Sequence, residues 1–597
     1  MLRPMLPEFS EVNMNLMMSF PDGYEPNEAQ SFILERIAEG LAAGKTNFIV
    51  NAPTATGKSF ISKTLANYSA SIPAGYEADF KANYFTPSRM EEREPWGTAI
   101  VTCTKALQEQ YAQLFEGGDV LMGKDNYDCT LDPANLCSMG KCAFAPDQAK
   151  ACLRRGLCPY QRARIRTHCN KCAFYNYSLF LSLPDRPLVK DWLIFDEASE
   201  MEDELVKAFT IELSYKSLKY SLSWIPPTPD SGSDSEEYRD WLIRLRDSFR
   251  SRMDELYTEL RDTKRKKGNS RFDKLCRTYS KVRGTYAELD RVLEVWDLTE
   301  WFPIHGADSV KFVPYAVDKL FWSREKVRKS SHRLFMSATI VNVESFMRTF
   351  GLDPVDTYYI EAPCSLDPTL APIVTVGSHY PTYRTKQTVY PAIAKAAVDI
   401  CNHPQLKGMN GLVHTQSMEL LECVRAAAGP GADEEGGRFL FRGRGLSNQD
   451  ILKIHESTER PTVMVSPSMT HGIDLKGDLG GFQVILKAPY PSIGDPRIAR
   501  KMKEDPDWYR DRMLSTLIQE CGRCNRLKTD RAITFILDSL AAKAIEENIS
   551  ILPSYFTARY TGRIKEVGTP KEPEGGADAK ASGEEADDKE AGDKGGS

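Results

Sequence analysis

The 597-residue sequence contains no apolar run that approaches the length of a membrane span, so neither a membrane-spanning protein nor a membrane partner is expected. Its first 20 residues also lack the uninterrupted apolar core of a secretory signal peptide, because Glu8, Glu11 and two prolines fall among them. These two absences predict an intracellular protein, cytoplasmic or, in a eukaryotic host, also nuclear.

A strong excess of one charge is missing as well. The 77 Lys and Arg against 83 Asp and Glu give a net charge of −6, of which residues 571–597 carry −5. The rest of the chain is nearly neutral, which neither requires nor excludes nucleic acid, because a groove can be basic on an acidic molecule. Residues 567–597 have no aromatic side chains and are rich in Gly, Ala and charged residues, which predicts a disordered acidic tail.

What is present indicates several globular domains. Hydrophobic residues make up 41% and charged residues 27% of the chain, as in soluble proteins. Short apolar runs alternate with helical patterns, which predicts an α/β fold with a parallel sheet. The apolar runs are 47–50, 98–102, 192–195 and 333–338, the helical patterns are 28–43 and 105–115, and a second α/β region extends from 373 past 538. Residues 236–296 are charged and helical in pattern, with one break at 268–270, which predicts a solvated helical bundle.

Cysteine is concentrated in one segment. Seven of the 14 cysteines fall within the 44 residues from Cys129 to Cys172. Disulfides are not expected in an intracellular protein, because cytosolic thiols stay reduced. A reduced cluster of this density therefore predicts a bound metal.

Residues 51–59 read Asn-Ala-Pro-Thr-Ala-Thr-Gly-Lys-Ser and directly follow an apolar strand. A phosphate-binding loop needs backbone N–H groups turned toward the phosphates, a lysine for the β and γ oxygens, and a hydroxyl for Mg²⁺. Gly57, Lys58 and Ser59 supply these groups. Two positions depart from the general pattern. Ala52 stands where that pattern has its first glycine, and Ala55 stands where a further glycine would make the turn more flexible.

Two further motifs complete a candidate ATPase. The apolar run 193–195 ends in Asp196 and Glu197, which is the form of a Walker B site: the first acid holds Mg²⁺ and the second polarises the attacking water. Downstream, Gln519 is followed by Arg523 and Arg526. Three residues apart on a helix, the two arginines would share a face and reach the γ-phosphate when two lobes close.

In order along the chain, these motifs resemble those of superfamily 2 helicases of the XPD/DinG type, the DNA helicases with an iron–sulfur cluster. The resemblance extends from about Tyr24 to Asp538. The matching segments are 24–30 (Q-like motif), 51–59 (motif I), 102–110 (motif Ia), 196–199 (DEAH box), 337–339 (motif III), 411–415 (motif IV), 466–474 (motif V) and 519–526 (motif VI).

The resemblance assigns roles residue by residue. The nucleotide-binding residues it implies are Gln30, Ala52, Pro53, Thr54, Ala55, Thr56, Gly57, Lys58, Ser59 and Asp474. The catalytic residues it implies are Lys58, Asp196, Glu197, Gln519, Arg523 and Arg526, with Ser59 and Asp196 on Mg²⁺. Contacts to the DNA strand are implied for Thr104, Lys105, Thr415 and Ser466. Ser199 replaces the histidine of the DEAH box, which is expected to weaken the link between the ATP site and motif III.

The cysteine segment resembles the family's iron–sulfur insert. Cys129 stands at the position of the first cluster ligand and Cys158 at that of the last. A [4Fe–4S] cluster needs four thiolates. We favour Cys137 and Cys142 as the middle pair, with Cys152 as the rival.

Two other cysteine pairs have the spacing Cys-x₂-Cys. Cys169 and Cys172 stand where relatives carry apolar residues, and their spacing would also suit zinc. Cys521 and Cys524 lie inside motif VI and are expected to be buried helix residues.

The fold implied is α/β with two RecA-like lobes, the first interrupted by two inserts. The expected divisions are 1–116, 179–202 and 323–365 for the first lobe, 117–178 for the iron–sulfur domain, 203–322 for a helical arch, 366–566 for the second lobe and 567–597 for the tail.

The function implied is ATP-dependent unwinding of DNA, with 5′ to 3′ translocation on single strands and with ATP, Mg²⁺ and a [4Fe–4S] cluster as cofactors. Single-stranded and forked DNA and other proteins of DNA metabolism, DNA repair included, are the expected partners of a monomer. Two alternatives stay open. One is a translocase that hydrolyses ATP on single strands yet unwinds poorly, and the other is a zinc-stabilised nucleic-acid-binding protein.

Overall fold

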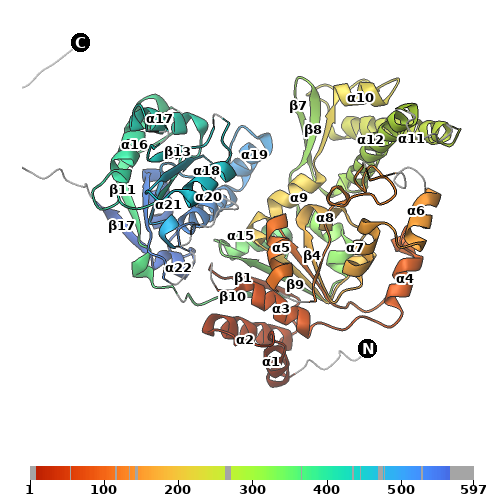
Figure 1. The fold of residues 1–597 in the computed structure, drawn as a ribbon, viewed down its shortest axis with the longest axis horizontal. Coiled ribbons are helices and arrows are strands. Elements are labelled where there is room, and N and C mark those ends of the chain that lie inside the picture. The colour runs from red at the N-terminus through yellow and green to blue at the C-terminus, as the bar shows by residue number, and fades with distance from the viewer. Residues whose placement is uncertain are drawn as a thin grey trace, which may run out of the picture.

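A computed structural model describes residues 8–53, 56–114, 117–133, 135–140, 146–262, 270–364, 366–382, 384–432, 434, 436–443, 445–467, 475, 477–525 and 529–564. Two α/β lobes stand side by side, and a helical extension rises from the first lobe (Figure 1). Within the described ranges, no helix is both long enough and apolar enough to cross a membrane.

The first lobe is built on a seven-stranded parallel sheet with the order β10-β1-β9-β5-β2-β4-β3. Its strands are β1 (Asn47–Asn51), β2 (Thr98–Thr102), β3 (Asp119–Val120), β4 (Cys172–Asn176), β5 (Trp192–Asp196), β9 (His332–Ser337) and β10 (Thr357–Glu361). β1, β2 and β5 are buried along their whole length, as expected of parallel strands covered on both faces. Since only β9 separates β1 from β5, the phosphate loop and the paired acids leave the sheet at the same edge.

Helices cover this sheet on both faces. They are α1 (Phe9–Met18), α2 (Glu28–Ala42), α3 (Lys58–Tyr68), α4 (Tyr76–Ala82), α5 (Lys105–Leu114), α8 (Tyr177–Ser182), α9 (Met201–Phe209), α13 (Asp318–Ser323), α14 (Glu325–Arg328) and α15 (Val343–Phe350). In Figure 1, α1, α2 and α3 lie together beneath β1 and β10.

The second lobe has its own seven-stranded parallel sheet, with the order β13-β14-β12-β15-β16-β11-β17. Its strands are β11 (Ile373–His379), β12 (Gly411–His414), β13 (Phe439–Phe441), β14 (Val463–Ser466), β15 (Phe482–Ile485), β16 (Ile533–Asp538) and β17 (Tyr560–Ile564). Its helices are α16 (Lys386–Cys401), α17 (Met418–Ala428), α18 (Asn448–Ser457), α19 (Pro496–Glu504), α20 (Pro506–Cys521), α21 (Ser539–Glu547) and α22 (Ser554–Thr557). The predicted α/β architecture with two lobes is thereby confirmed.

The helical insert is more than a bundle. The predicted long helical stretch is a pair of helices that pack against each other, α11 (Ser235–Asp262) and α12 (Ser270–Glu294), and Trp241, Leu245 and Leu289 are buried in one apolar cluster. Beside it, α10 (Tyr215–Ser221) joins a small antiparallel sheet that the sequence did not predict. Its order is β6-β8-β7, with β6 (Ile211–Ser214), β7 (Trp301–His305) and β8 (Ser309–Pro314).

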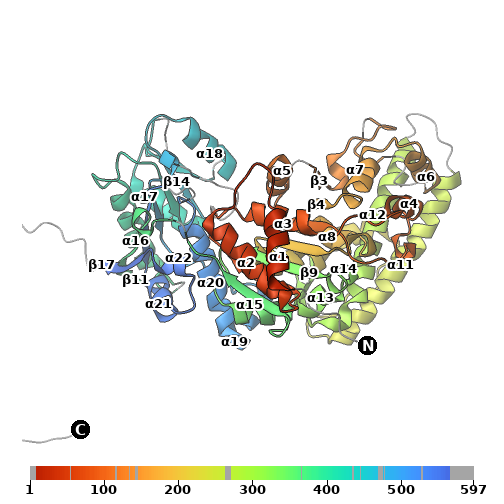
Figure 2. The ribbon, with the colours of Figure 1, turned by 90° about the horizontal axis from the view of Figure 1, so that it is seen from below.

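The cysteine-rich segment contains two helices, α6 (Pro146–Arg154) and α7 (Pro159–His168), although its sequence shows no clean period. It lies beside the end of the α11–α12 pair (Figure 2), where Met139 packs against Leu260 and Cys276. β3 and β4 on either side of it belong to the sheet of the first lobe.

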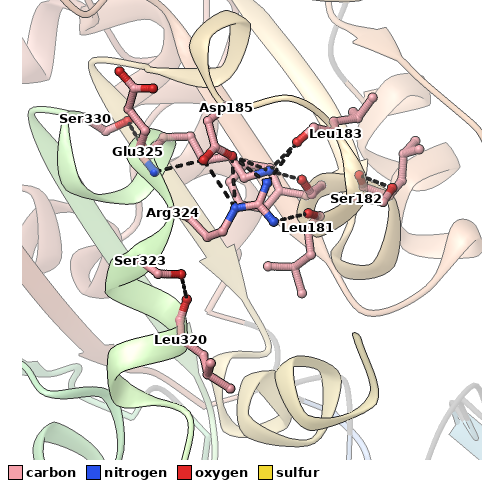
Figure 3. Close-up of polar contacts among 12 residues, drawn as sticks. Leu181, Ser182, Leu183, Asp185, Leu320, Ser323, Arg324, Glu325 and Ser330 are labelled. Atoms are coloured by element: carbon pink, nitrogen blue, oxygen red, sulfur yellow. Dashed lines mark hydrogen bonds and ion pairs between the residues drawn. The ribbon is translucent and has the colours of Figure 1, made fainter. Parts of the chain in front are cut away.

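A partly buried ion pair lies at the base of the arch. Arg324 donates from Nη2 to the Asp185 carboxylate at 2.6 Å and from Nη1 to the carbonyl of Leu181 at 2.8 Å (Figure 3). The backbone N–H of Glu325 donates to the same carboxylate at 2.9 Å. Burial acts to raise the pKa of Asp185, but these bonds and the neighbouring cations outweigh it and lower the pKa. Because Asp185 precedes β5 and Arg324 follows the arch, the pair ties the chain that returns from the arch to the segment that leads into β5.

Candidate active site and nucleic-acid interface

The phosphate loop requires glycine at position 57. Gly57 has φ of +80° at the start of α3, and a Cβ there would lie 2.4 Å from Nε2 of Gln30. Ala52 and Pro53 follow β1 and are buried, and Thr56 is buried before the helix. The predicted residues Thr54 and Ala55 lie outside the described part of the chain.

Gln30 supports this loop from the preceding helix. Asn27 and Gln30 form a capping box at the start of α2. The Gln30 amide then donates to the carbonyls of Thr56 and Gly57, at 3.2 and 3.3 Å. The Q-like motif is thus placed directly against the phosphate loop.

Lys58 and the paired acids face the same edge of the sheet. Lys58 Nζ donates to the carbonyl of Ala52 at 3.2 Å, across the loop. Asp196 is buried and accepts from the hydroxyl of Tyr111 at 3.0 Å. Burial and the nearby Glu197 raise the pKa of Asp196 to about 6, while the charge of Lys58 lowers it.

Glu197 is held in an unusual backbone conformation. Its φ is +52°, in the left-handed region that residues other than glycine rarely adopt. Its backbone N–H donates to Asp196 Oδ1 at 3.1 Å, and this turns the chain sharply between the two acids. Strain at such a position is typical of active sites.

The residues present fit a Mg²⁺–nucleotide. α3 directs the N–H groups of its first turn toward the loop, where a phosphate would bind. Ser59, half-buried in that turn, and Asp196 supply the hydroxyl and carboxylate oxygens that Mg²⁺ prefers. The cleft therefore offers both the anion site and the cation ligands.

Ser199 keeps a direct contact with motif III, and the expected weakening of this link relative to a histidine stays a prediction. Its hydroxyl accepts from Ser337 Oγ and from Thr339 Oγ1, both at 3.0 Å. Ser337 and Thr339 are themselves 3.3 Å apart between hydroxyl oxygens. A short side chain reaches motif III here because β9 is the neighbour of β5 in the sheet.

The second lobe presents Arg523 from a turn instead of a helix. α20 ends at Cys521, with Gly522 as its cap, so the expected helical face shared by two arginines does not form at Arg523. Arg523 is buried, and its charge acts to lower the pKa of Glu200, which burial raises to about 7. Arg526 and Asp474 lie outside the described residues, while Gln519 is in the last turn of α20.

Glu520, beside Gln519, forms a buried polar group with motif IV. Gln416 Nε2 donates to Glu520 Oε1 at 2.7 Å, and His414 Nδ1 lies 3.7 Å from the same oxygen. Burial raises the pKa of Glu520 to about 8 and lowers that of His414 to about 3. Both groups are therefore neutral at pH 7, which is how a buried carboxyl and imidazole coexist.

α20 also joins the two lobes at its other end. Arg512 Nη1 donates to the backbone carbonyl of Ser199 at 2.9 Å, and its other nitrogen pairs with Asp203. One turn earlier, Trp508 Nε1 donates to Glu202 at 2.7 Å. Glu202 also pairs with Arg497 of α19, and all three of Glu202, Arg497 and Trp508 are buried.

The residues expected to touch DNA fall into two groups. Thr104 caps the start of α5 through Oγ1, and the exposed Lys105 bonds Asn126 at 3.0 Å. Thr415 directly follows β12 and Ser466 ends the neighbouring β14; the Thr415 N–H donates to the Ser466 carbonyl at 3.1 Å, and both residues are fully buried. Their contact with a strand stays a prediction.

Three of the four favoured cluster ligands are buried close together. Cys137 Sγ lies 3.8 Å from Cys158 Sγ. Burial raises the pKa of Cys137, and the neighbouring thiols of Cys158 and Cys129 raise it further. A Cβ on Gly140 would lie 2.6 Å from Cys129 Sγ, so the glycine leaves room for that thiol. Cys142 lies outside the described residues, and among the described ones no group of three His, Cys, Asp or Glu is placed to hold a metal ion.

The remaining cysteines separate into different surroundings. Cys152, on α6, is buried in the same apolar cluster as Cys129, Cys137 and Cys158. Cys169 packs against the cluster around Phe80, whereas Cys172 lies in β4 and belongs to a different apolar cluster. The two thiols whose spacing would suit zinc therefore pack in different apolar clusters. Cys521 and Cys524 are likewise buried in separate clusters, the latter beyond the end of its helix.

Comparison with known proteins adds a family and a fold. Residues 400–552 match the helicase C-terminal domain family. A solved XPD helicase is similar with a TM-score of 0.53 and 14% identity over 94% of this chain and 100% of that chain. The chain therefore has the fold of XPD helicases. Xpd4 from S. tokodaii gives a TM-score of 0.50 and 15% identity over 89% and 99% of the two chains. No match was found among curated protein sequences.

Within this XPD-like fold, several residues that contact the helicase motifs or join the two lobes were not identified from the sequence. Tyr111, Gln416, Glu202 and Arg512 lie outside the helicase motifs or at their edges. Only Tyr111 had a usable signal, because its helix, residues 105–114, begins within motif Ia and Tyr111 is the residue after it. The other three gain partners from distant parts of the chain, 104 residues away for Gln416 and 313 for Arg512.

Proposed function

We propose that this protein is an ATP-dependent DNA helicase that translocates 5′ to 3′ on single-stranded DNA as a monomer. The observation that carries the proposal is that motif residues of the two lobes lie near each other. Gly57, Lys58, Asp196 and Glu197 lie at one edge of the first lobe, and Arg523 of the second lobe is near enough to Glu200 for its charge to act on the pKa of that carboxyl.

In this proposal each residue has one task. Lys58 and the N–H groups of α3 bind the phosphates, and Ser59 and Asp196 bind Mg²⁺. Glu197, turned out of β5 by its left-handed conformation, orients the attacking water. Arg523 neutralises charge that develops on the γ-phosphate when the lobes close. Closure and reopening then move the strand, and the buried contacts of α20 transmit that motion between lobes.

A [4Fe–4S] cluster belongs to the same proposal. Cys129, Cys137 and Cys158 would hold it, with Cys142 as the fourth ligand and Cys152 as its rival. Soft thiolate ligands suit iron–sulfur clusters. The cluster would stabilise the segment that packs against the end of the arch, and so define a passage for the strand.

The test is unwinding by anaerobically purified protein, comparing duplexes with a 5′ tail and with a 3′ tail. We expect only the 5′-tailed duplex to open, and only with ATP. Lys58→Ala should lose hydrolysis by at least about 100-fold and all unwinding, since it removes a charge on the transferring phosphate. Lys63→Ala, on the same helix, is the matched control.

Opening of the 3′-tailed duplex alone contradicts the polarity. Hydrolysis stimulated by single strands with neither duplex opened supports the translocase instead.

A further inference from the structure

The arch contains a pocket that no helicase motif explains. It is open, has a volume of about 460 Å³, and is lined by Ser214, Lys216, Ser217, Tyr220, Arg277 and Lys281. Ser214 ends β6, the next three residues lie on α10, and the last two lie on α12. The volume falls in the range of sites that hold a small ligand or a nucleotide unit. We call this site the arch pocket.

The side chains of the arch pocket reach it from two helices. Lys216 and Tyr220 are four residues apart on α10, and Arg277 and Lys281 are four apart on α12, so each pair shares a helix face. Leu218 points the opposite way and is buried. The two helices therefore present one pair each across the same hollow.

The lining is entirely basic or neutral. Three cations and two serine hydroxyls surround the pocket, and no carboxylate lines it. Within the part of the chain that the structure describes, none of the three cations forms an ion pair with an acidic side chain. Three like charges around one hollow repel each other, and an anion that binds between them removes that cost.

Tyr220 adds a second kind of contact. The residue is 56% exposed, so its ring is accessible to a ligand. Lys281 Nζ lies 5.3 Å from its ring centroid, and its hydroxyl lies 3.4 Å from Thr278 Oγ1. The ring is thus held at the edge of the pocket from the side of α12.

We propose that the arch pocket binds the phosphodiester backbone of single-stranded DNA, with a base stacked on Tyr220. The proposal rests on the proposed helicase function and adds a strand contact outside the two lobes. Cations that pair with phosphates and an exposed ring that stacks on a base are the two elements of sequence-independent single-strand binding. An acidic protein segment would use the cations but would gain less from the ring.

The test is binding of a fluorescent oligothymidylate at several salt concentrations. The triple variant Lys216→Ala, Arg277→Ala, Lys281→Ala should reduce the slope of log K against log salt by about 2, at about 0.7 for each phosphate that the variant no longer neutralises. The matched control removes three lysines outside the pocket, by Lys207→Ala, Lys219→Ala and Lys274→Ala, and should leave the slope close to that of the wild type.

Stacking is tested separately at Tyr220. Tyr220→Ala should weaken binding roughly 5- to 100-fold, and Tyr220→Phe, which keeps the ring and removes only the hydroxyl, should bind as the wild type does. Equal slopes for the triple variant and its control overturn the arch pocket while leaving the helicase function intact. Loss of polyglutamate binding in the triple variant, with unchanged DNA binding, also overturns it in favour of an acidic partner. If the wild-type chain binds no DNA, the proposed function fails and this inference fails with it.

Discussion

The hydroxyl of Ser199 accepts hydrogen bonds from Ser337 and Thr339, and its backbone carbonyl accepts one from Arg512. The residue therefore contacts motif III and the second lobe at once. Ser199→Ala removes the shared acceptor, and we expect the free energy of unfolding to fall by about 1 kcal/mol. Since motif III lies between the ATP site and the second lobe, base pairs opened per ATP should fall more than ATP hydrolysis. Parallel unwinding and phosphate-release assays measure that ratio, and an unchanged ratio contradicts the coupling role.

Glu520 makes a prediction about pH. Burial raises its pKa from 4.5 to about 8, so the folded chain holds the proton more tightly than the unfolded chain does. Its stabilising contribution is complete below pH 4.5 and is lost as the pH rises toward 8. Glu520→Gln stays neutral and keeps an acceptor for Gln416, so its stability should fall less between pH 6 and 9. Thermal unfolding across this range measures the difference, with the exposed Glu547→Gln as control. Parallel curves for wild type and Glu520→Gln would contradict the assignment.

At the scale of elements, α20 connects two functions. Its first turns bind the first lobe through Trp508 and Arg512, and Arg523 follows its last turn. A change in the anchoring turn therefore shifts the arginine at the other end. Glu202→Gln weakens the bonds from Arg497 and Trp508, and we expect kcat for ATP hydrolysis to fall roughly 10-fold with little change in KM, because the phosphate loop is untouched. Glu204→Gln, on the same helix and paired with the exposed Lys207, is the control. Equal reductions of kcat in both variants would contradict the proposal that α20 transmits a change at Glu202 to Arg523.

The ion pair at the base of the arch is an element-scale contact of a different kind, because it ties the end of the insertion to the segment before β5. Asp185→Asn leaves Arg324 and the neighbouring Lys326 without their carboxylate. We expect the free energy of unfolding to fall by about 2–3 kcal/mol, near the lower end for a broken buried pair, since both side chains keep some exposure. Asp399→Asn, which breaks an exposed pair with Lys395, should cost below about 0.5 kcal/mol. Urea unfolding compares the two.

For the whole molecule, what the sequence could predict depends on how local the determinant is. The strands that end in the phosphate loop and in Asp196 were predicted to within a residue, because each is an apolar run closed by a polar motif. The arch sheet was not predicted, for two reasons. β6 pairs with β8 about 100 residues later, and Pro303 within β7 is a residue that sequence patterns rarely assign to a strand. The turn at Gly522, which separates Arg523 from α20, and the partners of Glu202 depend on tertiary packing, which periodicity does not encode.

The iron–sulfur proposal is tested on the whole chain, because the cysteine segment packs against the first lobe and the arch together. Cys158→Ser should lose iron, acid-labile sulfide and unwinding, while single-strand-stimulated ATP hydrolysis remains, since the nucleotide cleft is formed by other residues. Cys142→Ser should do the same, and Cys152→Ser should keep its iron. If Cys152→Ser loses its iron while Cys142→Ser keeps it, the fourth ligand is Cys152 and not Cys142. Wild-type protein that binds zinc without sulfide would replace the cluster by a zinc site, and the helicase assay would then show whether unwinding survives that exchange.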